Sequence, residues 1–203
     1  MKKGKFIVFE GIDGAGKTTQ IQLLAKRLRE SGVDVDVSAE PTTNESGKAL
    51  RRALSGQDKK SYCEMAAMFV LDRIGHNYEI RELVDAGKTV ISDRYYYSSL
   101  AYQGKATDYN WVRTMNIDCP DIRRPDVCIY LDLTPEESLK RISNGRESVE
   151  IYENLEKLTS VRNTFLSVIE DLRAEGESIY IVDANRAPDE IAREIASIVD
   201  KHI

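Results

Sequence analysis

The sequence has few cysteines and histidines, and no apolar run approaches the length of a membrane span. The cysteines Cys63, Cys119 and Cys128 are odd in number and not closely spaced, which favours neither a disulfide framework nor a CxxC metal site. The two histidines stand apart from any cluster of ligand-type residues. The apolar stretch after the basic start is too short for a signal peptide. We therefore expect a cytoplasmic protein with reduced thiols and no membrane partner.

The sequence also lacks an excess of basic residues. It has 29 Lys and Arg against 34 Asp and Glu, which gives a net charge of −5. This balance argues against a broad basic surface that binds nucleic acid. A hydrophobic share of 41% with 31% charged residues is typical of a folded globular protein, not of a disordered one. We expect a single domain over residues 1–203 and no nucleic-acid partner, although a small phosphorylated ligand could still have a locally basic pocket.

Strand-like and helix-like segments alternate along the chain. Short apolar or alternating runs predict strands at Lys5–Glu10, Val33–Val37, Thr89–Asp93, Asp126–Asp132 and Ser178–Asp183. Helical spacing and caps predict helices at Lys17–Glu30, at Gly47–Leu54, from the capping box Ser61–Glu64 to about Ala86, and at Pro188–Lys201. Between these last two, one helix is expected to begin at Pro135 and another to end at Glu175. This order predicts an α/β domain with a five-stranded parallel sheet and helices on both faces. A polar stretch at 143–150 interrupts the helical pattern between Pro135 and Glu175.

The segment Gly11–Thr18 matches the phosphate-binding pattern G-x-x-x-x-G-K-[ST]. Its glycines let the backbone curl so that several N–H groups point at phosphate oxygens, and the following helix adds its positive dipole end. Lys17 is expected to reach the β- and γ-phosphates of ATP, and the Thr18 hydroxyl to bind Mg²⁺. The expected ATP-binding residues of this loop are Gly11, Ile12, Asp13, Gly14, Ala15, Gly16, Lys17, Thr18 and Thr19.

Other features narrow the class of P-loop protein. The guanine-reading tetrapeptide N-K-x-D of regulatory GTPases is absent from the sequence. Asp72–Gly75 fits D-x-x-G formally, but it lies inside a predicted helix and not at a strand end. The chain is too short for a large motor or transporter ATPase. A small-molecule kinase is the interpretation that remains.

The acceptor site is expected after the third predicted strand, because ligands of open parallel sheets bind beyond the carboxyl ends of the strands. There Asp93 can hold the water shell of Mg²⁺ or the arginine of the site, so we count it among the metal-binding and catalytic residues. Arg94 can bridge the donor and acceptor phosphates with its planar guanidinium. The residues that follow it should face the same cleft, among them Tyr95, Ser98, Tyr102 and Gln103.

The segment Ile91–Gln103 resembles the hallmark of the thymidylate kinases, and Phe9–Gln20 resembles their P-loop. The strand end Tyr130–Pro135 is similar as well, so the resemblance covers essentially the whole chain. It implies phosphorylation of dTMP to dTDP with MgATP, a step of dTTP synthesis, and a homodimer. The P-loop carboxylate, which contacts the acceptor sugar in the family, corresponds to Asp13.

The same resemblance assigns further substrate-binding residues. Phe69 matches the aromatic that stacks on thymine, and Arg73, one turn later, matches the arginine that binds the base edge; the spacing places both on one helix face. Arg51 matches an arginine that binds the acceptor phosphate, and Glu40 matches the glutamate of the Glu-Pro stretch that follows the second predicted strand. Many members carry an arginine beside or within that stretch, and some carry one in the P-loop. This sequence has neither. In the family a mobile lid, here expected at 143–150, then supplies the missing cation. Arg146 is the catalytic candidate in this lid, and Arg141, just before it, is expected to bind ATP.

A phosphate acceptor is already anionic at neutral pH, so the expected mechanism needs no general base. Lys17, Mg²⁺, Arg94 and the lid arginine would share the neutralisation of charge in an in-line transfer. A deoxynucleoside kinase is the nearest alternative, with Glu40 as the base for a sugar hydroxyl. A kinase for dUMP or UMP and a slow ATP-hydrolysing regulator also remain open.

Overall fold

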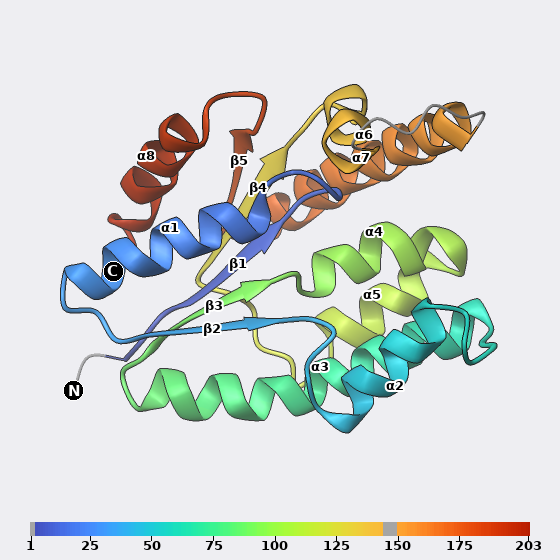
Figure 1. Ribbon diagram of the computed structural model, residues 1–203. Helices are drawn as coiled ribbons and strands as arrows, with labels where there is room; N and C mark the ends of the chain where they lie inside the picture. Colours follow the sequence, from blue (N-terminus) through green and yellow to red (C-terminus); the bar gives the residue numbers. More distant parts are fainter. Residues whose placement is uncertain (1–2, 144–149) are drawn as a thin grey trace.

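Five parallel strands form the central sheet of the computed structural model, which describes residues 3–143 and 150–203, with side chains at 3–142 and 155–203 (Figure 1). In chain order the strands are β1 (Phe6–Glu10), β2 (Val35–Ala39), β3 (Thr89–Asp93), β4 (Val127–Asp132) and β5 (Ile179–Asp183). Their order in the sheet is β2-β3-β1-β4-β5, and every neighbouring pair is parallel. The predicted five-stranded parallel sheet is confirmed.

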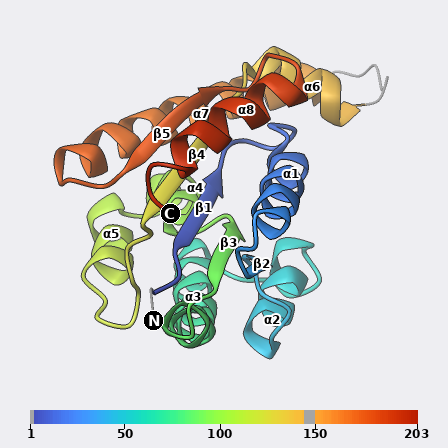
Figure 2. The same cartoon turned by 90° about the vertical axis from the view of Figure 1, so that its left-hand side faces the viewer.

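Helices cover both faces of this sheet, as predicted (Figure 2). On one face α1 (Lys17–Glu30) packs beside α8 (Pro188–Val199). On the other lie α3 (Tyr62–Asp85), α4 (Tyr96–Ala106), α5 (Tyr109–Ile117) and α7 (Glu150–Ala174). Next to these, α2 (Glu45–Leu54) packs on α3, and α6 (Pro135–Ser143) packs on α7. No helix of the described residues is long and apolar enough to cross a membrane.

The central strands are buried because helices cover them from both sides, which is why their sequences are continuously apolar and not alternating. Every residue of β1 from Phe6 to Glu10 is at most 1% exposed. The carboxyl ends of β1, β2 and β3 lie at the same edge of the sheet (Figure 1). The loops that follow these three strands therefore face one another, as the acceptor-site argument requires.

Two local differences from the predicted elements have clear causes. The strand predicted from Val33 begins at Val35 because Val33 still belongs to the cap of α1: Gly32 N–H donates to Arg29 O and Val33 N–H to Leu28 O. The sequence pattern predicts no helix between Asp93 and Asp126, where α4 and α5 lie. The α4 sequence begins Tyr-Tyr-Ser-Ser, which are weak helix formers, and tertiary packing provides the stability instead.

Candidate active site

The loop between β1 and α1 has the backbone shape of a phosphate cradle. Gly11 and Gly16 adopt positive φ angles of 145° and 88°. A Cβ atom on Gly11 would lie 2.7 Å from the carbonyl oxygen of Leu131, so only glycine fits there. The first turn of α1 contains no acidic residue, and no side chain caps it. Its N–H groups are therefore available to an anion at the positive end of the helix dipole.

Lys17 lies at the base of this loop and is 8% exposed. Its ammonium donates to the carbonyl oxygens of Gly11 at 3.0 Å and of Ile12 at 3.4 Å. Burial, followed by the positive charge of Arg94, lowers the pKa of Lys17. A cavity of about 420 Å³ opens beside the loop. It is lined by Asp13, Gly14, Gly16, Lys17, Thr18, Thr19, Ala39, Glu40, Asp93 and Arg94.

Two residues of this cavity fit Mg²⁺. Thr18 offers a hydroxyl, and the Oδ1 atom of Asp93 is buried without a hydrogen-bond partner. Such hard oxygen atoms are the ligands that Mg²⁺ prefers, together with phosphate oxygens and water. No cluster of three or more His, Cys, Asp or Glu side chains suited to a metal occurs among the described residues. A Mg²⁺ ion at this site would therefore share its coordination with a bound nucleotide.

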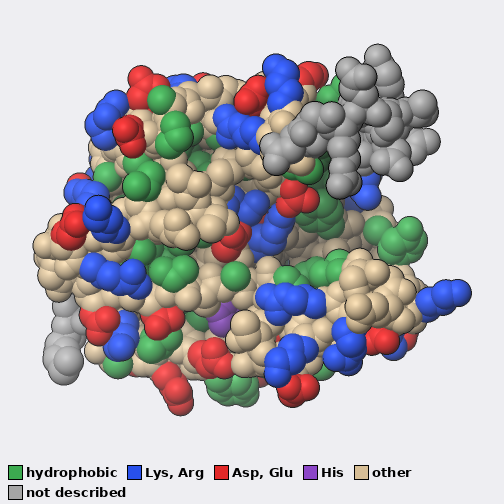
Figure 3. Space-filling view, in the orientation of Figure 1, with side chains coloured by type: hydrophobic (Ala, Val, Ile, Leu, Met, Phe, Trp, Pro, Cys, Tyr) green, Lys and Arg blue, Asp and Glu red, His purple; other side chains and the backbone are tan. Residues whose placement is uncertain are grey.

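Arg94 stands where two cavities meet. It is the only residue other than glycine with a positive φ angle, 72°, in the described part of the chain. Its guanidinium donates to Ser98 Oγ at 3.1 Å and to Asp13 Oδ1 at 2.5 Å, and it lies 5.9 Å from the ring centre of Tyr102. Burial opposes the charge of Arg94, but Glu10, Tyr102, Asp13 and Asp93 outweigh that effect and raise its pKa. The site therefore holds a permanent cation. The space-filling view contains a hollow lined by basic and acidic side chains (Figure 3).

The second cavity, about 280 Å³ in volume, has a largely apolar wall. Its lining is Asp13, Pro41, Leu54, Phe69, Arg94, Ser98, Tyr102 and Gln103. Six of these were predicted as site residues: Phe69 comes from α3, three come from α4, and Arg94 and Asp13 also line the phosphate cavity. A planar apolar group in this cavity would contact the Phe69 ring while its polar end reaches Arg94.

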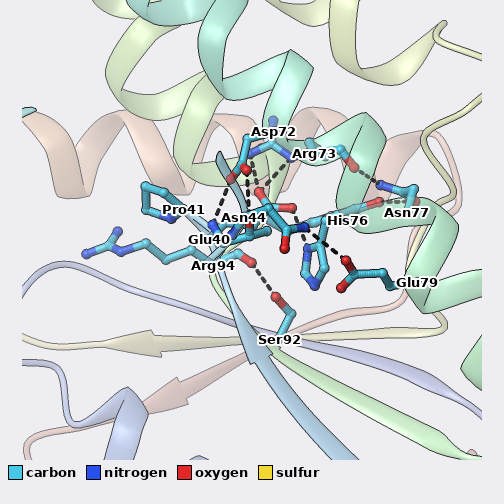
Figure 4. Close-up of polar contacts among 12 residues, drawn as sticks. Glu40, Pro41, Asn44, Asp72, Arg73, His76, Asn77, Glu79, Ser92 and Arg94 are labelled. Atoms are coloured by element: carbon cyan, nitrogen blue, oxygen red, sulfur yellow. Dashed lines mark hydrogen bonds and ion pairs between the residues drawn. The ribbon is translucent and has the colours of Figure 1, made fainter. Parts of the chain in front are cut away.

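Glu40 and Arg73 form a buried ion pair outside the second cavity. Glu40 Oε2 accepts hydrogen bonds from Arg73 Nε at 2.9 Å and Nη2 at 2.6 Å, and Glu40 Oε1 contacts His76 Nδ1 at 3.0 Å. Ser99 and Asn116 accept from Arg73 Nη1. These contacts leave at most one of the five N–H donors of Arg73 for a ligand. In Figure 4 the Arg94 side chain points away from this cluster.

The remaining predicted residues either lie outside the lining of the two cavities or fall outside the described part of the chain. The Tyr95 side chain is fully buried and its hydroxyl donates to Asn77, so it packs in the core and lines neither cavity. Arg51 donates to the carbonyl oxygens of Pro41 and Thr42 and lines a separate cavity of about 580 Å³. Arg141 lies over the P-loop and donates to the carbonyl oxygens of Gly14 and Ala184. Arg146 and the segment 144–149 lie outside the described residues.

Two buried acids of the site were not predicted from the sequence. Glu10 accepts from the N–H groups of Tyr95 and Ser98 and from the Ser98 hydroxyl. Burial raises the pKa of Glu10, and Arg94, Ser98 and Tyr95 oppose that shift. Asp72 accepts from Thr42 and Ser46 and so ties the loop after β2 to α3. An acid at the end of an apolar strand is a signal that could have identified Glu10.

Comparisons with known proteins find similar sequences over nearly the whole chain. The thymidylate kinase family model matches residues 9–195. A probable thymidylate kinase of Pyrococcus horikoshii is 39% identical over 207 residues, covering 98% of this chain and 97% of the relative. One from Methanococcus aeolicus is 40% identical over 207 residues, with 98% of both chains covered. A thymidylate kinase of Maridesulfovibrio salexigens is 37% identical over 214 residues, covering 97% and 95%.

Proposed function

The chain belongs to the thymidylate kinase family, and we propose that it transfers the γ-phosphoryl group of ATP to dTMP, which forms dTDP and ADP. One observation carries this proposal: Arg94 and Asp13 line both the phosphate cavity beside Lys17 and the apolar cavity beside Phe69. A donor triphosphate in the first cavity and a nucleoside monophosphate in the second would bring their phosphates together at Arg94.

The chemistry of this site suits a phosphate acceptor. The second pKa of a phosphate monoester is about 6, so the attacking oxygen is already anionic at neutral pH and needs no base. A sugar hydroxyl would need one, and Glu40 was the candidate. Glu40 accepts two hydrogen bonds from Arg73, contacts His76, and does not line the cavity beside Phe69 in which a nucleoside would lie. The hydroxyl-acceptor alternative therefore loses its base.

Catalysis in the proposed reaction is the positioning of two anions and the neutralisation of their charge. Lys17 would leave its loop carbonyls for the β- and γ-phosphates, and the Arg94 guanidinium would exchange Asp13 for phosphate oxygens. A Mg²⁺ ion held by Thr18 and Asp93 would supply further positive charge. Arg141 donates to the P-loop carbonyl of Gly14, which supports its proposed role in binding ATP. Arg146 stays the proposed lid cation.

Base recognition is proposed to combine stacking on Phe69 with polar contacts from α4. Phe69 is half-buried and Gln103 lines the same cavity. Stacking of a base on an aromatic ring contributes about 1–3 kcal/mol. Arg73 would contribute its one remaining donor and, through Glu40, the orientation of the loop after β2. Arg51 is proposed to turn from its carbonyl partners to the acceptor phosphate.

The homodimer and the lid at 143–150 remain proposals from the resemblance, and the single domain and the cytoplasmic location remain proposals from the sequence. The surface of α3 supports the dimer: Leu71 is 63% exposed and Tyr78 is 57% exposed, two turns apart on one face of that helix. Sedimentation equilibrium of the wild type and of a Leu71→Asp variant tests it. We expect twice the chain mass for the wild type and a weaker dimer for the variant; a monomeric wild type would contradict the proposal.

An acceptor panel tests the proposed reaction. Formation of ADP from MgATP is measured separately with dTMP, dUMP, UMP, AMP and thymidine. We expect the highest kcat/KM with dTMP and little turnover of thymidine. Turnover of thymidine without turnover of dTMP would overturn the proposal that the acceptor is a phosphate. A preference for dUMP or UMP would show that the site selects uracil and not thymine.

A further inference from the structure

A buried carboxylate lies directly beneath the turn that carries Arg94. Glu10, the last residue of β1, is 1% exposed and has no role in the reaction as described so far. Its Oε1 atom accepts from Tyr95 N–H at 2.8 Å and from Ser98 N–H at 3.1 Å. Its Oε2 atom accepts from Ser98 Oγ at 2.7 Å. One side chain therefore binds the first turn of α4 at three points immediately after Arg94.

The direction of these hydrogen bonds links Glu10 to the Arg94 guanidinium. An ionised carboxylate can only accept, so the Ser98 hydroxyl donates its single hydrogen to Glu10 Oε2. The lone pairs of Ser98 Oγ are then left for Arg94 Nη1, which donates to them at 3.1 Å. The chain of donors runs from Arg94 through Ser98 to Glu10. The negative end of that chain is the buried carboxylate.

The backbone of Arg94 needs such support. Its φ angle of 72° is unfavourable for a residue with a side chain and persists only when the surroundings hold it. Arg94 N–H donates to Phe9 O, and Ser92 Oγ donates to Arg94 O, both at 2.9 Å. Glu10 binds the next N–H group in the chain, that of Tyr95. It thus continues the series of contacts that fix the turn on its α4 side.

We propose that Glu10 is a positioning residue that orients Arg94 toward the acceptor phosphate, acting through Ser98 and through the turn that follows β3. This inference rests on the proposed function, because it assumes that Arg94 binds the phosphate of dTMP. Glu10 itself lines neither cavity. It follows that loss of Glu10 weakens recognition of the phosphate group only while Arg94 is present.

A thermodynamic cycle tests this dependence. The affinities of dTMP and thymidine are measured by calorimetry for the wild type, Glu10→Gln, Arg94→Ala and the double variant, and the preference for dTMP is taken from each ratio. The glutamine amide places a donor or a weaker acceptor against Ser98. We expect Glu10→Gln to reduce the preference roughly tenfold, and to change it less than about twofold when Arg94 is already alanine. Equal effects in both backgrounds would overturn the proposal.

A matched control separates positioning from general destabilisation. Glu177 is also a buried carboxylate, 4% exposed on its side chain, and accepts from the hydroxyls of Tyr96 and Tyr97 on the same helix. Glu177→Gln should lower the melting temperature and leave the preference for dTMP unchanged. If it reduced the preference as much as Glu10→Gln, the role of Glu10 would be merely structural.

Two further results keep the inference distinct from the proposed function. If Glu10→Gln does not fold, Ser98→Ala takes its place in the cycle, because it removes the same link to Arg94 Nη1. A wild-type protein that binds dTMP no better than thymidine would refute the proposed function itself. A wild type that prefers dTMP, with that preference intact in Glu10→Gln or Ser98→Ala, would refute only the positioning role.

Discussion

Removal of the Glu40 carboxylate should be among the most destabilising single changes at the site. The Arg73 side chain is 1% exposed, and in Glu40→Ala it loses the acceptor of two hydrogen bonds. His76 loses the contact between its Nδ1 atom and Glu40 Oε1. Breaking a buried ion pair from one side costs about 3–5 kcal/mol of the free energy of unfolding. For a chain of this size that is a fall of roughly 6–20 °C in melting temperature.

Denaturation by heat and by urea, followed by circular dichroism, measures this effect. Asp200→Ala is the matched control, because Asp200 also accepts two hydrogen bonds from one arginine, Arg27, but the two side chains are 51% and 42% exposed. An exposed pair is worth at most about 1 kcal/mol. If Glu40→Ala cost no more than Asp200→Ala, the buried pair would not stabilise the loop as argued. Replacing both partners, with Glu40→Leu and Arg73→Met, should recover much of the lost stability.

Other predictions concern turnover, base binding and pH. Arg94→Ala should lower kcat about 10³-fold or more while the KM for ATP changes little, and steady-state kinetics with unchanged turnover would refute its assignment. Phe69→Ala should raise the KM for dTMP by roughly 10- to 100-fold, and an unaltered KM would remove the stacking role. Burial raises the pKa of Glu177 above its ordinary 4.5, so the folded state binds the proton more tightly. The contribution of the protonated carboxyl to folding is therefore lost as the pH rises from 4.5 through the pKa of the folded state. Over that rise, the free energy of unfolding of the wild type should fall relative to that of Glu177→Gln in urea titrations. A difference that stays constant or grows would contradict this.

Much of the sheet could be predicted because its signals are local. Thr89–Asp93 is a strand over the predicted residues, and Ser61 and Glu64 form the predicted capping box at the start of α3. Helix α4 carries no such signal. Its first two residues, Tyr96 and Tyr97, are buried in the core, and its stability comes from tertiary contacts, which a single-sequence pattern does not contain.

The candidate site divides in the same way. The P-loop residues and the cluster around Arg94 follow from motif spacing, because they sit at the ends of adjacent strands. The partners of Arg73 do not: Glu40, Ser99 and Asn116 are 26 to 43 residues away in the sequence. The role of Glu10 could not be predicted from the segment Phe9–Gln20, since its hydrogen bonds with Ser98 span 88 residues. Long-range polar pairing of this kind becomes visible only in the folded structure.

The most direct test of the account is the fate of the transferred phosphoryl group. Phosphorus NMR follows MgATP and dTMP with catalytic amounts of the protein. The account predicts that the dTMP signal is replaced by the coupled α and β signals of dTDP at the rate at which ADP forms. Formation of ADP with free phosphate and an unchanged dTMP signal would contradict it, because the protein would then be an ATPase and not a phosphotransferase.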